Sequence, residues 1–486
     1  MPLRRQPLVV TTLGETRHPY MTGAWTPLHE EVDLPDPEVL EGRIPEDIEG
    51  VYLRNTENPV HEPLGRYHPF DGDGMIHMMS FCDGEVEYRN RFVQTDGLRA
   101  EIEVGHALWA GLAEPPSKSL RDGACARGRM KDASSTDIVV HAGVAVSSFY
   151  QCGDLYRLDP HTLEDLGKET WGDAFPAAGV SAHTKVDVRT GELLFFNYQT
   201  TAPFMHYGVV SAERQLVHYV PIELPGARLP HDMAFTPNYS ILNDCPLFWD
   251  PDLIGRGIYA TRYYRDMPMR IGIIPRFGAS QEIRWFECKS TFVLHWINAW
   301  EEGDEVVLDG YFEDDPSPRV STDSTIEARM FRFLDLHSMK SRPYRWRFNM
   351  RTGHVTEGYL SDTITEFGMI DQARAGLPYR YVYSVVPTKG MFTFDGLIKH
   401  DVRTGSEEVL KFGEGVVGSE TVVARKPNAV DEDDAWLITF TSDVPNDVSH
   451  CKVYDAKGLN EGPVATVQLP ERMSSGTHAC WAPAVR

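Results

Sequence analysis

The chain has 486 residues, 42% of them hydrophobic and 24% charged, which is the composition of a globular protein with enough chain for a large core. Its 47 basic and 71 acidic residues give a formal net charge of −24. This charge excludes the basic footprint of a nucleic-acid-binding protein and opposes electrostatic docking on anionic lipid. No run of 18 apolar residues occurs, so the sequence predicts no transmembrane segment.

The cysteines indicate a reducing compartment. Seven cysteines are scattered along the chain, and no two have CxxC spacing. An odd number without paired spacing argues against both a disulfide framework and a thiolate zinc site. The apolar stretch at residues 8–10 is too short for the core of a signal peptide. We therefore expect a cytoplasmic protein.

In chain order, residues 1–34 carry turn signals and few strand patterns, which predicts an N-terminal arm. From residue 35 onward, short apolar or alternating runs typical of β-strands dominate, for example residues 76–81 and 86–93. Asp83 and Gly84 separate these two runs as a hairpin turn. The pattern predicts an all-β chain.

One turn sequence recurs and indicates how the strands are arranged. Residues 187–191, 349–353 and 401–405 are near copies that begin with Asp or Asn and end with Arg-Thr-Gly. In each copy the first side chain can cap the turn and the glycine can adopt positive φ. Hairpin turns repeated through a chain favour a radial array of four-stranded blades, which is one domain at any length. The intervals are irregular, so the period alone does not identify a propeller.

Four histidines stand in similar settings, each at the end of a strand-like run and far from the others: His183, His231, His295 and His478. His295, for example, lies between an apolar run and Trp296. A single histidine of this kind is usually a buried core residue whose ring nitrogens have partners. None of the four has HxxxH spacing, so spacing alone does not distinguish structural histidines from metal ligands.

These histidine contexts resemble, in order, the iron-ligand segments of the carotenoid cleavage oxygenase family. The resemblance runs from about residue 35 to residue 483 and includes residues 54–56, 67–77, 379–383, 394–401, 431–434 and 436–440. It implies a seven-bladed β-propeller, formed by residues 35–486 as a single domain, with a loop and helix cap over one face. We expect the cap in inserted segments near residues 98–132, 200–228 and 245–270 because these are irregular and contain Gly, Pro and aromatic residues.

The resemblance also implies an activity. The chain would be a non-haem iron(II) dioxygenase, with one Fe(2+) per chain, O2 as co-substrate and no organic cofactor. It would cleave a C=C bond of an apolar conjugated small molecule to give two carbonyl products. Zinc is the alternative metal, although closed zinc sites are usually thiolate-rich. A non-catalytic propeller that binds proteins is the alternative from another functional class. Any contact with a membrane surface is expected to be weak and to be made by the cap.

Residue by residue, the resemblance implies the metal ligands His183, His231, His295 and His478, with Thr136 facing an open position on the metal. Ligand histidines normally donate their second N–H to an acceptor. The family's glutamates for this task match Glu366 and Glu420, whereas the third position is Gln151, which departs from the family and carries no charge.

The preferred substrate depends on a second departure. Family members that cleave phenolic stilbenes commonly carry Lys where this chain has Tyr150, and tyrosine is neutral at pH 7. We therefore expect an apocarotenoid or carotenoid-like substrate, with stilbene or phenylpropene cleavage as the alternative if Lys131 or a cap arginine supplies a cation. Six aromatic residues are candidates for an apolar tunnel, although ordinary core packing is the alternative for each: Phe70, Trp109, Phe149, Tyr150, Phe204 and Trp296.

Overall fold

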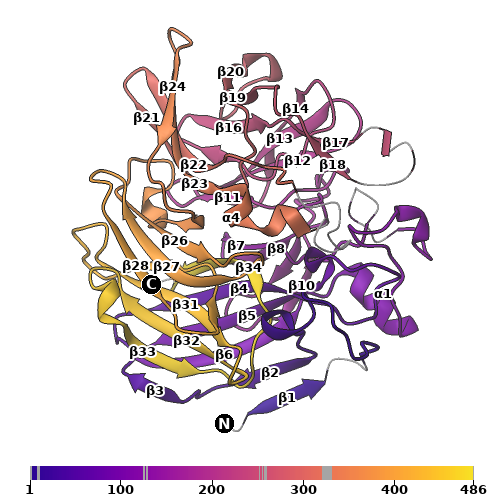
Figure 1. The fold of residues 1–486 in the computed structure, drawn as a ribbon, viewed down its shortest axis with the longest axis vertical. Helices are drawn as coiled ribbons and strands as arrows, with labels where there is room; N and C mark the ends of the chain where they lie inside the picture. Colours follow the sequence, from indigo (N-terminus) through magenta and orange to yellow (C-terminus); the bar gives the residue numbers. More distant parts are fainter. Residues whose placement is uncertain are drawn as a thin grey trace. The chain divides into compact units, whose positions relative to one another are not determined.

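Antiparallel strands are the main regular structure of the computed structural model, which describes residues 3–7, 11–123, 126, 130–250, 252–253, 256, 260–319 and 331–484 (Figure 1). The chain divides into two compact units. The first comprises residues 1–182 and 409–486, and the second comprises residues 183–408. This all-β content agrees with the alternating runs in the sequence.

The first unit begins with a sheet in the order β1-β2-β6-β5-β4-β34. Its strands are β1 (Arg4–Pro7), β2 (Glu30–Leu34), β4 (Gly50–Asn58), β5 (Asp73–Cys82), β6 (Glu85–Phe92) and β34 (Gly476–Pro483). Asp83 and Gly84 join β5 to β6 with φ values of 51° and 76°, which confirms the predicted hairpin turn. Both β1 and β2 lie within residues 1–34 and extend this sheet from β6.

Two more antiparallel sheets belong to the first unit. One contains β7 (Asp137–His141), β8 (Val144–Ser148), β9 (Tyr156–Leu158) and β10 (Asp165–Lys168). The other contains β29 (Val416–Gly418), β30 (Val422–Arg425), β31 (Ala435–Asp443), β32 (Val448–Asp455), β33 (Pro463–Gln468) and β3 (Val39–Gly42). Helix α1 (Asp96–Val104) follows β6, and the Thr95 hydroxyl caps it by accepting a hydrogen bond from the Leu98 N–H.

The two ends of the chain exchange strands within the first unit. The last strand, β34, pairs with β4 near the start of the chain, where Ala482 lies opposite Val51. Conversely, the early strand β3 pairs with β33, where Val39 lies opposite Val467. Each of these sheets is therefore completed by a strand from the opposite end of the sequence.

The second unit contains four successive antiparallel sheets. Their strands are β11 (Lys185–Asp187), β12 (Glu192–Tyr198), β13 (Phe204–Val210) and β14 (Leu216–Glu223); β15 (Ala234–Phe235), β16 (Tyr239–Asp244), β19 (Met269–Pro275) and β20 (Arg284–Cys288); β21 (Trp296–Glu302), β22 (Glu305–Glu313), β23 (Ser341–Asn349) and β24 (Val355–Tyr359); and β25 (Glu366–Met369), β26 (Tyr381–Pro387) and β27 (Phe394–Asp401). A separate hairpin consists of β17 (Leu247–Trp249) and β18 (Thr261–Tyr263). Strand β28 (Glu407–Lys411) spans the boundary between the units.

Helices are short. Besides α1, the described residues contain α4 (Leu336–Met339) and the single 3-10 turns η1 (Gly23–Trp25), η2 (Pro69–Asp71), η3 (Pro116–Lys118), η4 (Ser280–Glu282), η5 (Phe331–Leu334), η6 (Gln372–Arg374) and η7 (Leu459–Glu461). No helix in this part of the chain has both the length and the apolar character needed to cross a membrane.

The recurring turns form as predicted. Each joins the end of one strand to the next, and the glycines at residues 191, 353 and 405 have φ values of 73°, 82° and 74°. The first side chain of each copy accepts backbone N–H bonds: Asp187 from Arg189, Asn349 from Thr352 and Asp401 from Arg403.

The predicted cap segments contain several of these elements. The segment 98–132 includes most of α1, the segment 200–228 includes β13 and β14, and the segment 245–270 includes β17 and β18. Parts of the first and third segments lie outside the described residues.

The core of the second unit lies on both faces of its central strands. In β22, Val306 and Leu308 pack with Trp346 in one buried cluster. The alternate residues Val307 and Tyr311 pack into a second cluster on the opposite face. Because side chains alternate along a strand, burial of both faces fixes the register of β22 and the direction of each side chain.

Candidate metal centre

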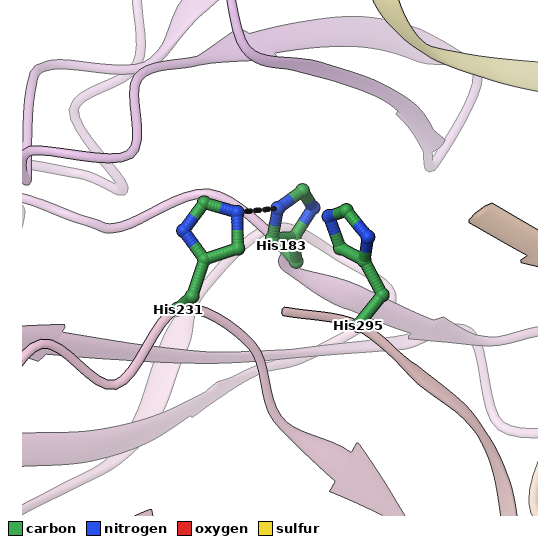
Figure 2. Close-up of side chains that lie close together, drawn as sticks. All are labelled: His183, His231 and His295. Carbon is green, nitrogen blue, oxygen red and sulfur yellow. Dashed lines mark hydrogen bonds between the residues drawn. The ribbon is translucent and has the colours of Figure 1, made fainter. Parts of the chain in front are cut away.

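Three of the four predicted histidines converge within the second unit. His183 lies two residues before β11, His231 three residues before β15, and His295 immediately before β21. Each histidine therefore enters at the start of the first strand of its own sheet. All three are buried, and Figure 2 shows their rings facing one another. The sheets supply one imidazole each, from positions up to 112 residues apart in the sequence, as 295 − 183 shows.

The ring geometry suits a shared ion. The Nε2 atoms of His183 and His231 are 3.2 Å apart. Ring centroids are 4.8 Å apart for His183 and His231, 4.9 Å for His183 and His295, and 5.3 Å for His231 and His295. One nitrogen from each ring lies within 4.8 Å of the others. Imidazole donors without thiolates suit iron, copper, nickel or zinc, so these residues fit a transition metal.

Glu366 orients one of these rings. Its Oε2 atom lies 2.7 Å from His295 Nδ1, and the carboxylate is fully buried at the start of β25. The backbone N–H of Phe367 donates to the same oxygen. A carboxylate on Nδ1 holds the proton there and leaves Nε2 as the nitrogen for a metal. Glu366 therefore contacts one of the four histidines that the sequence predicts as metal ligands.

An aromatic wall next to His295 was not predicted from the sequence. Phe367 lies 4.5 Å from the His295 ring, measured between centroids, and packs against Phe392 and Phe394. Phe367 has a φ of 54°, which is uncommon for a non-glycine residue and is typical of constrained functional sites. These apolar rings therefore lie against one side of the His295 ring.

The fourth histidine has a similar arrangement within the first unit. His478 lies on β34, and its Nδ1 is 3.4 Å from Glu420 Oε1. The other Glu420 oxygen accepts the backbone N–H of Ala479 at 2.6 Å. Glu420 therefore contacts both the His478 ring and the strand that carries it.

Thr136 and Tyr150 lie together in the first unit. The Thr136 hydroxyl accepts the backbone N–H of Tyr150, and its carbonyl accepts the hydroxyl of Thr477, the neighbour of His478. Burial raises the pKa of Tyr150 well above its ordinary value, so its phenol stays neutral at pH 7. Gln151, next in sequence, is also buried.

The six candidate tunnel aromatics separate into groups. In the first unit, Tyr150 lies 5.9 Å from Phe70 and 5.0 Å from Phe149, measured between ring centroids. Trp109 is buried in the same unit. In the second unit, Trp296 packs edge-on against Trp346 in the core, whereas Phe204 is part of β13.

Lys131 forms ion pairs with two carboxylates. Its Nζ lies 2.7 Å from Asp73 and 2.6 Å from Glu101. Burial alone would lower the pKa of Lys131, but the two carboxylates outweigh it and raise the pKa. This lysine is therefore held as part of a buried ion triad.

The sequence is similar to known proteins over nearly its whole length. The sequence profile of the family described as "Retinal pigment epithelial membrane protein" matches residues 25–483. A carotenoid 9,10(9',10')-cleavage dioxygenase from Crocus sativus is 32% identical, over 95% of this chain and 88% of its own length. Lignostilbene-alpha,beta-dioxygenase isozyme III from Sphingomonas paucimobilis is 28% identical, over 96% of this chain and 97% of its own.

Solved structures share the fold. The lignostilbene dioxygenase of Pseudomonas brassicacearum superimposes with a TM-score of 0.85 at 26% identity, over 97% of this chain and 100% of that one. A cobalt-substituted oxygenase from Synechocystis gives a TM-score of 0.81 at 24% identity. The predicted fold class, an all-β seven-bladed propeller, is confirmed by this likeness.

Proposed function

The chain belongs to the carotenoid cleavage oxygenase family, and on this premise we propose that it is an iron(II)-dependent dioxygenase. It cleaves a C=C bond of a conjugated apolar substrate, and the two atoms of O2 end in two carbonyl products. The observation that carries this proposal is the cluster of His183, His231 and His295, with Glu366 behind His295.

The metal would be held by four neutral imidazoles, those of His183, His231 and His295 together with His478. The contact between His478 and Glu420 supports the fourth assignment because it repeats the contact between His295 and Glu366. Neutral ligands leave the full 2+ charge on the ion, and iron(II) bound in this way supplies the activation of O2. We propose one iron per chain.

The acceptors behind the rings differ in charge. Glu366 and Glu420 each place a carboxylate against a ligand ring, whereas we assign Gln151 the third such position without a charge. The site would then be one unit more positive than with three glutamates. Thr136 would face the open position on the metal, where its methyl group limits access.

An apocarotenoid or carotenoid-like polyene is the proposed substrate class. A polyene is already electron-rich and needs a dry aromatic passage, for which Phe70, Phe149 and Tyr150 are candidates. Phenolic stilbenes gain from a cation beside the phenol oxygen, but Tyr150 is neutral and Lys131 is held by Asp73 and Glu101.

Stilbene or phenylpropene cleavage is the second candidate. The high structural likeness to a lignostilbene dioxygenase favours it. A non-catalytic binding protein is disfavoured because it would have no use for converging buried imidazoles. We further propose a cytoplasmic enzyme in which residues 35–486 act as one catalytic domain. Weak contact of its cap with a membrane surface belongs to the same proposal.

Metal analysis of His295→Ala tests the proposal. We expect about one iron per chain in the parent and severe loss of iron and turnover in the variant, because one of few strong ligands is removed. His206→Ala is the matched control, since His206 bonds Asn197 and stacks on Tyr219. Full iron and parental activity in His295→Ala would overturn the assignment.

A parallel assay addresses the substrate. The parent's kcat/KM on an apocarotenoid aldehyde and on a 4-hydroxystilbene, with chromatographic detection of the aldehydes, is expected to favour the polyene. A clear preference for the phenol, lost in Tyr150→Phe, would reverse the ranking and leave the metal site unaffected.

A further inference from the structure

A set of contacts beside the three histidines links the segments that carry them. Lys185 lies two residues after His183, Asp232 follows His231, and Trp296 follows His295. The histidines come from three different sheets, so their backbones do not share one strand ladder. Side chains must therefore fix the spacing between the three segments.

Asp232 makes the linking contacts. One carboxylate oxygen, Oδ1, lies 2.7 Å from Lys185 Nζ. The other, Oδ2, accepts the backbone N–H of Trp296 at 2.9 Å. The Asp232 carbonyl accepts the Trp296 indole N–H at 3.3 Å and the Asn243 amide at 2.7 Å. A single residue thus bonds to the segment after His183 and to the segment after His295.

Burial makes these contacts strong and specific. The Asp232 side chain is 1% exposed and the Lys185 side chain is 27% exposed. A buried carboxylate is costly unless a cation and N–H donors satisfy it, and removing one partner leaves the other uncompensated. The arrangement therefore tolerates little displacement of the three segments relative to one another.

We propose that Asp232 is a positioning residue, which holds His183, His231 and His295 in ligating geometry before a metal binds. It acts through Lys185 and Trp296 and does not itself coordinate the ion. Metal affinity then depends on Asp232 because a prearranged site does not have to order three segments on binding. The proposal rests on the proposed function, since it takes these histidines as metal ligands.

The test compares metal affinity with stability. Asp232→Asn keeps an acceptor for the Trp296 N–H and removes the charge that Lys185 requires. We expect it to weaken anaerobic binding of Fe(II) and of Co(II) by about 10–100-fold, and to shift the cobalt absorption bands. Trp296→Phe, which removes the indole N–H and part of the buried ring but keeps the backbone N–H that bonds Asp232, is expected to have a smaller effect on metal affinity.

Asp309→Asn is the matched control. Asp309 is fully buried in the same unit and forms a bidentate ion pair with Arg345, with both contacts at 2.8 Å. This variant is expected to lower Tm equally with and without metal and to keep parental metal affinity. A purely structural role for Asp232 would give the same pattern and would overturn the proposal.

Two further variants separate the possible failures. If Asp232→Asn does not fold, Lys185→Met/Asp232→Asn removes both charges and leaves none uncompensated. It is expected to show the loss of metal affinity of about 10–100-fold given above. Parental metal affinity in a folded Asp232 variant, alongside loss of metal in His295→Ala, would refute the positioning role alone. Parental affinity in His295→Ala would refute the proposed function itself.

Discussion

The contact between Glu366 and His295 gives one carboxylate control over both the tautomer and the charge of a proposed ligand. Glu366→Gln keeps the size of the side chain and removes the charge, so the fold should persist. We expect metal affinity or kcat to fall by about 10–100-fold, because the ring becomes a weaker donor. Iron titration together with steady-state kinetics checks this.

Glu301→Gln is a suitable control for that substitution. Glu301 lies on β21 in the same unit and binds Thr236 and Asn238. Its loss should change metal affinity little. Equal affinities in Glu366→Gln and the parent would remove Glu366 from the site.

Glu313 is another buried carboxyl in this unit, at the end of β22. Neither of its carboxyl oxygens has a hydrogen-bond partner among the residues that the structure describes. Burial raises its pKa well above the ordinary value, and the charges of Glu366 and Asp315 raise it further. The fold therefore favours the protonated form of Glu313.

The raised pKa of Glu313 makes the stability of the fold depend on pH. An unfolded glutamate titrates at about pH 4.3, whereas folded Glu313 keeps its proton to higher pH. The stability that protonated Glu313 provides is fully present below the unfolded pKa and is lost as pH rises toward the folded pKa. Glu313→Gln does not incur this loss. The Tm of the variant minus that of the parent should therefore increase from pH 5 to pH 8.

Cys245 and Tyr263 also lie within electrostatic reach of Glu313, but both stay neutral over this range because burial raises the pKa of each. A difference in Tm that stays constant with pH would show that Glu313 ionises normally in the fold.

Sequence reasoning reached the histidines and the glutamates behind them, but it did not reach Asp232 and Lys185. A histidine at a strand end is a chemically distinctive residue, and four of them in family order predicted a site. Asp232 and Lys185 gave no such signal, because their contact joins positions 47 residues apart, as 232 − 185 shows. An aspartate that follows a histidine indicates nothing by itself in the sequence. Only the fold shows that Lys185 lies beside Asp232.

At the scale of elements, Gly310 is the only glycine of β22, and it lies against Trp296, the residue that follows His295. A Cβ atom on Gly310 would lie 2.5 Å from the Trp296 ring. Gly310→Ala must therefore displace the indole, at a cost of about 1–3 kcal/mol in unfolding free energy. We expect a lower Tm and weaker metal binding, measured on the same protein preparation.

Gly358→Ala provides the comparison within the same sheet. Gly358 lies on β24, and a Cβ atom there would have no neighbour within 4 Å. The substitution should leave Tm and metal affinity close to those of the parent. If Gly310→Ala behaves in the same way, the packing of Trp296 does not support the site.

Local turn chemistry was readable from the sequence, whereas sheet membership was not. Asp401 and Gly405, for example, marked a turn because each residue type has a specific backbone role. By contrast, β13 and β14 fall within a segment that looked irregular, yet they form two strands of a regular sheet. Their sequence includes Pro221 and Gly208, which obscure the alternation on which strand prediction depends.

For the whole molecule, strand patterns predicted an all-β chain and repeated turns favoured a radial array of blades, whereas the seven-bladed propeller itself came from the resemblance. The pairing of β3 and β34 with strands from the opposite end of the sequence could not be predicted, because pairing between Val39 and Val467 has no local signature. The net charge of −24 has a consequence at this scale. It favours the approach of a divalent cation and keeps the protein dispersed.

The late position of β34 in the chain has a consequence for biosynthesis. As the nascent polypeptide leaves the ribosome, β34 emerges after all the other described strands. Until then, one hydrogen-bonding edge of β4 has no partner strand. Such an edge invites pairing with other chains, and crowded polysomes present many of them. His478 is part of the same strand, β34. Closing the sheet and delivering the proposed fourth ligand are therefore one event, which keeps iron from being captured by a complete set of histidines before translation has passed β34.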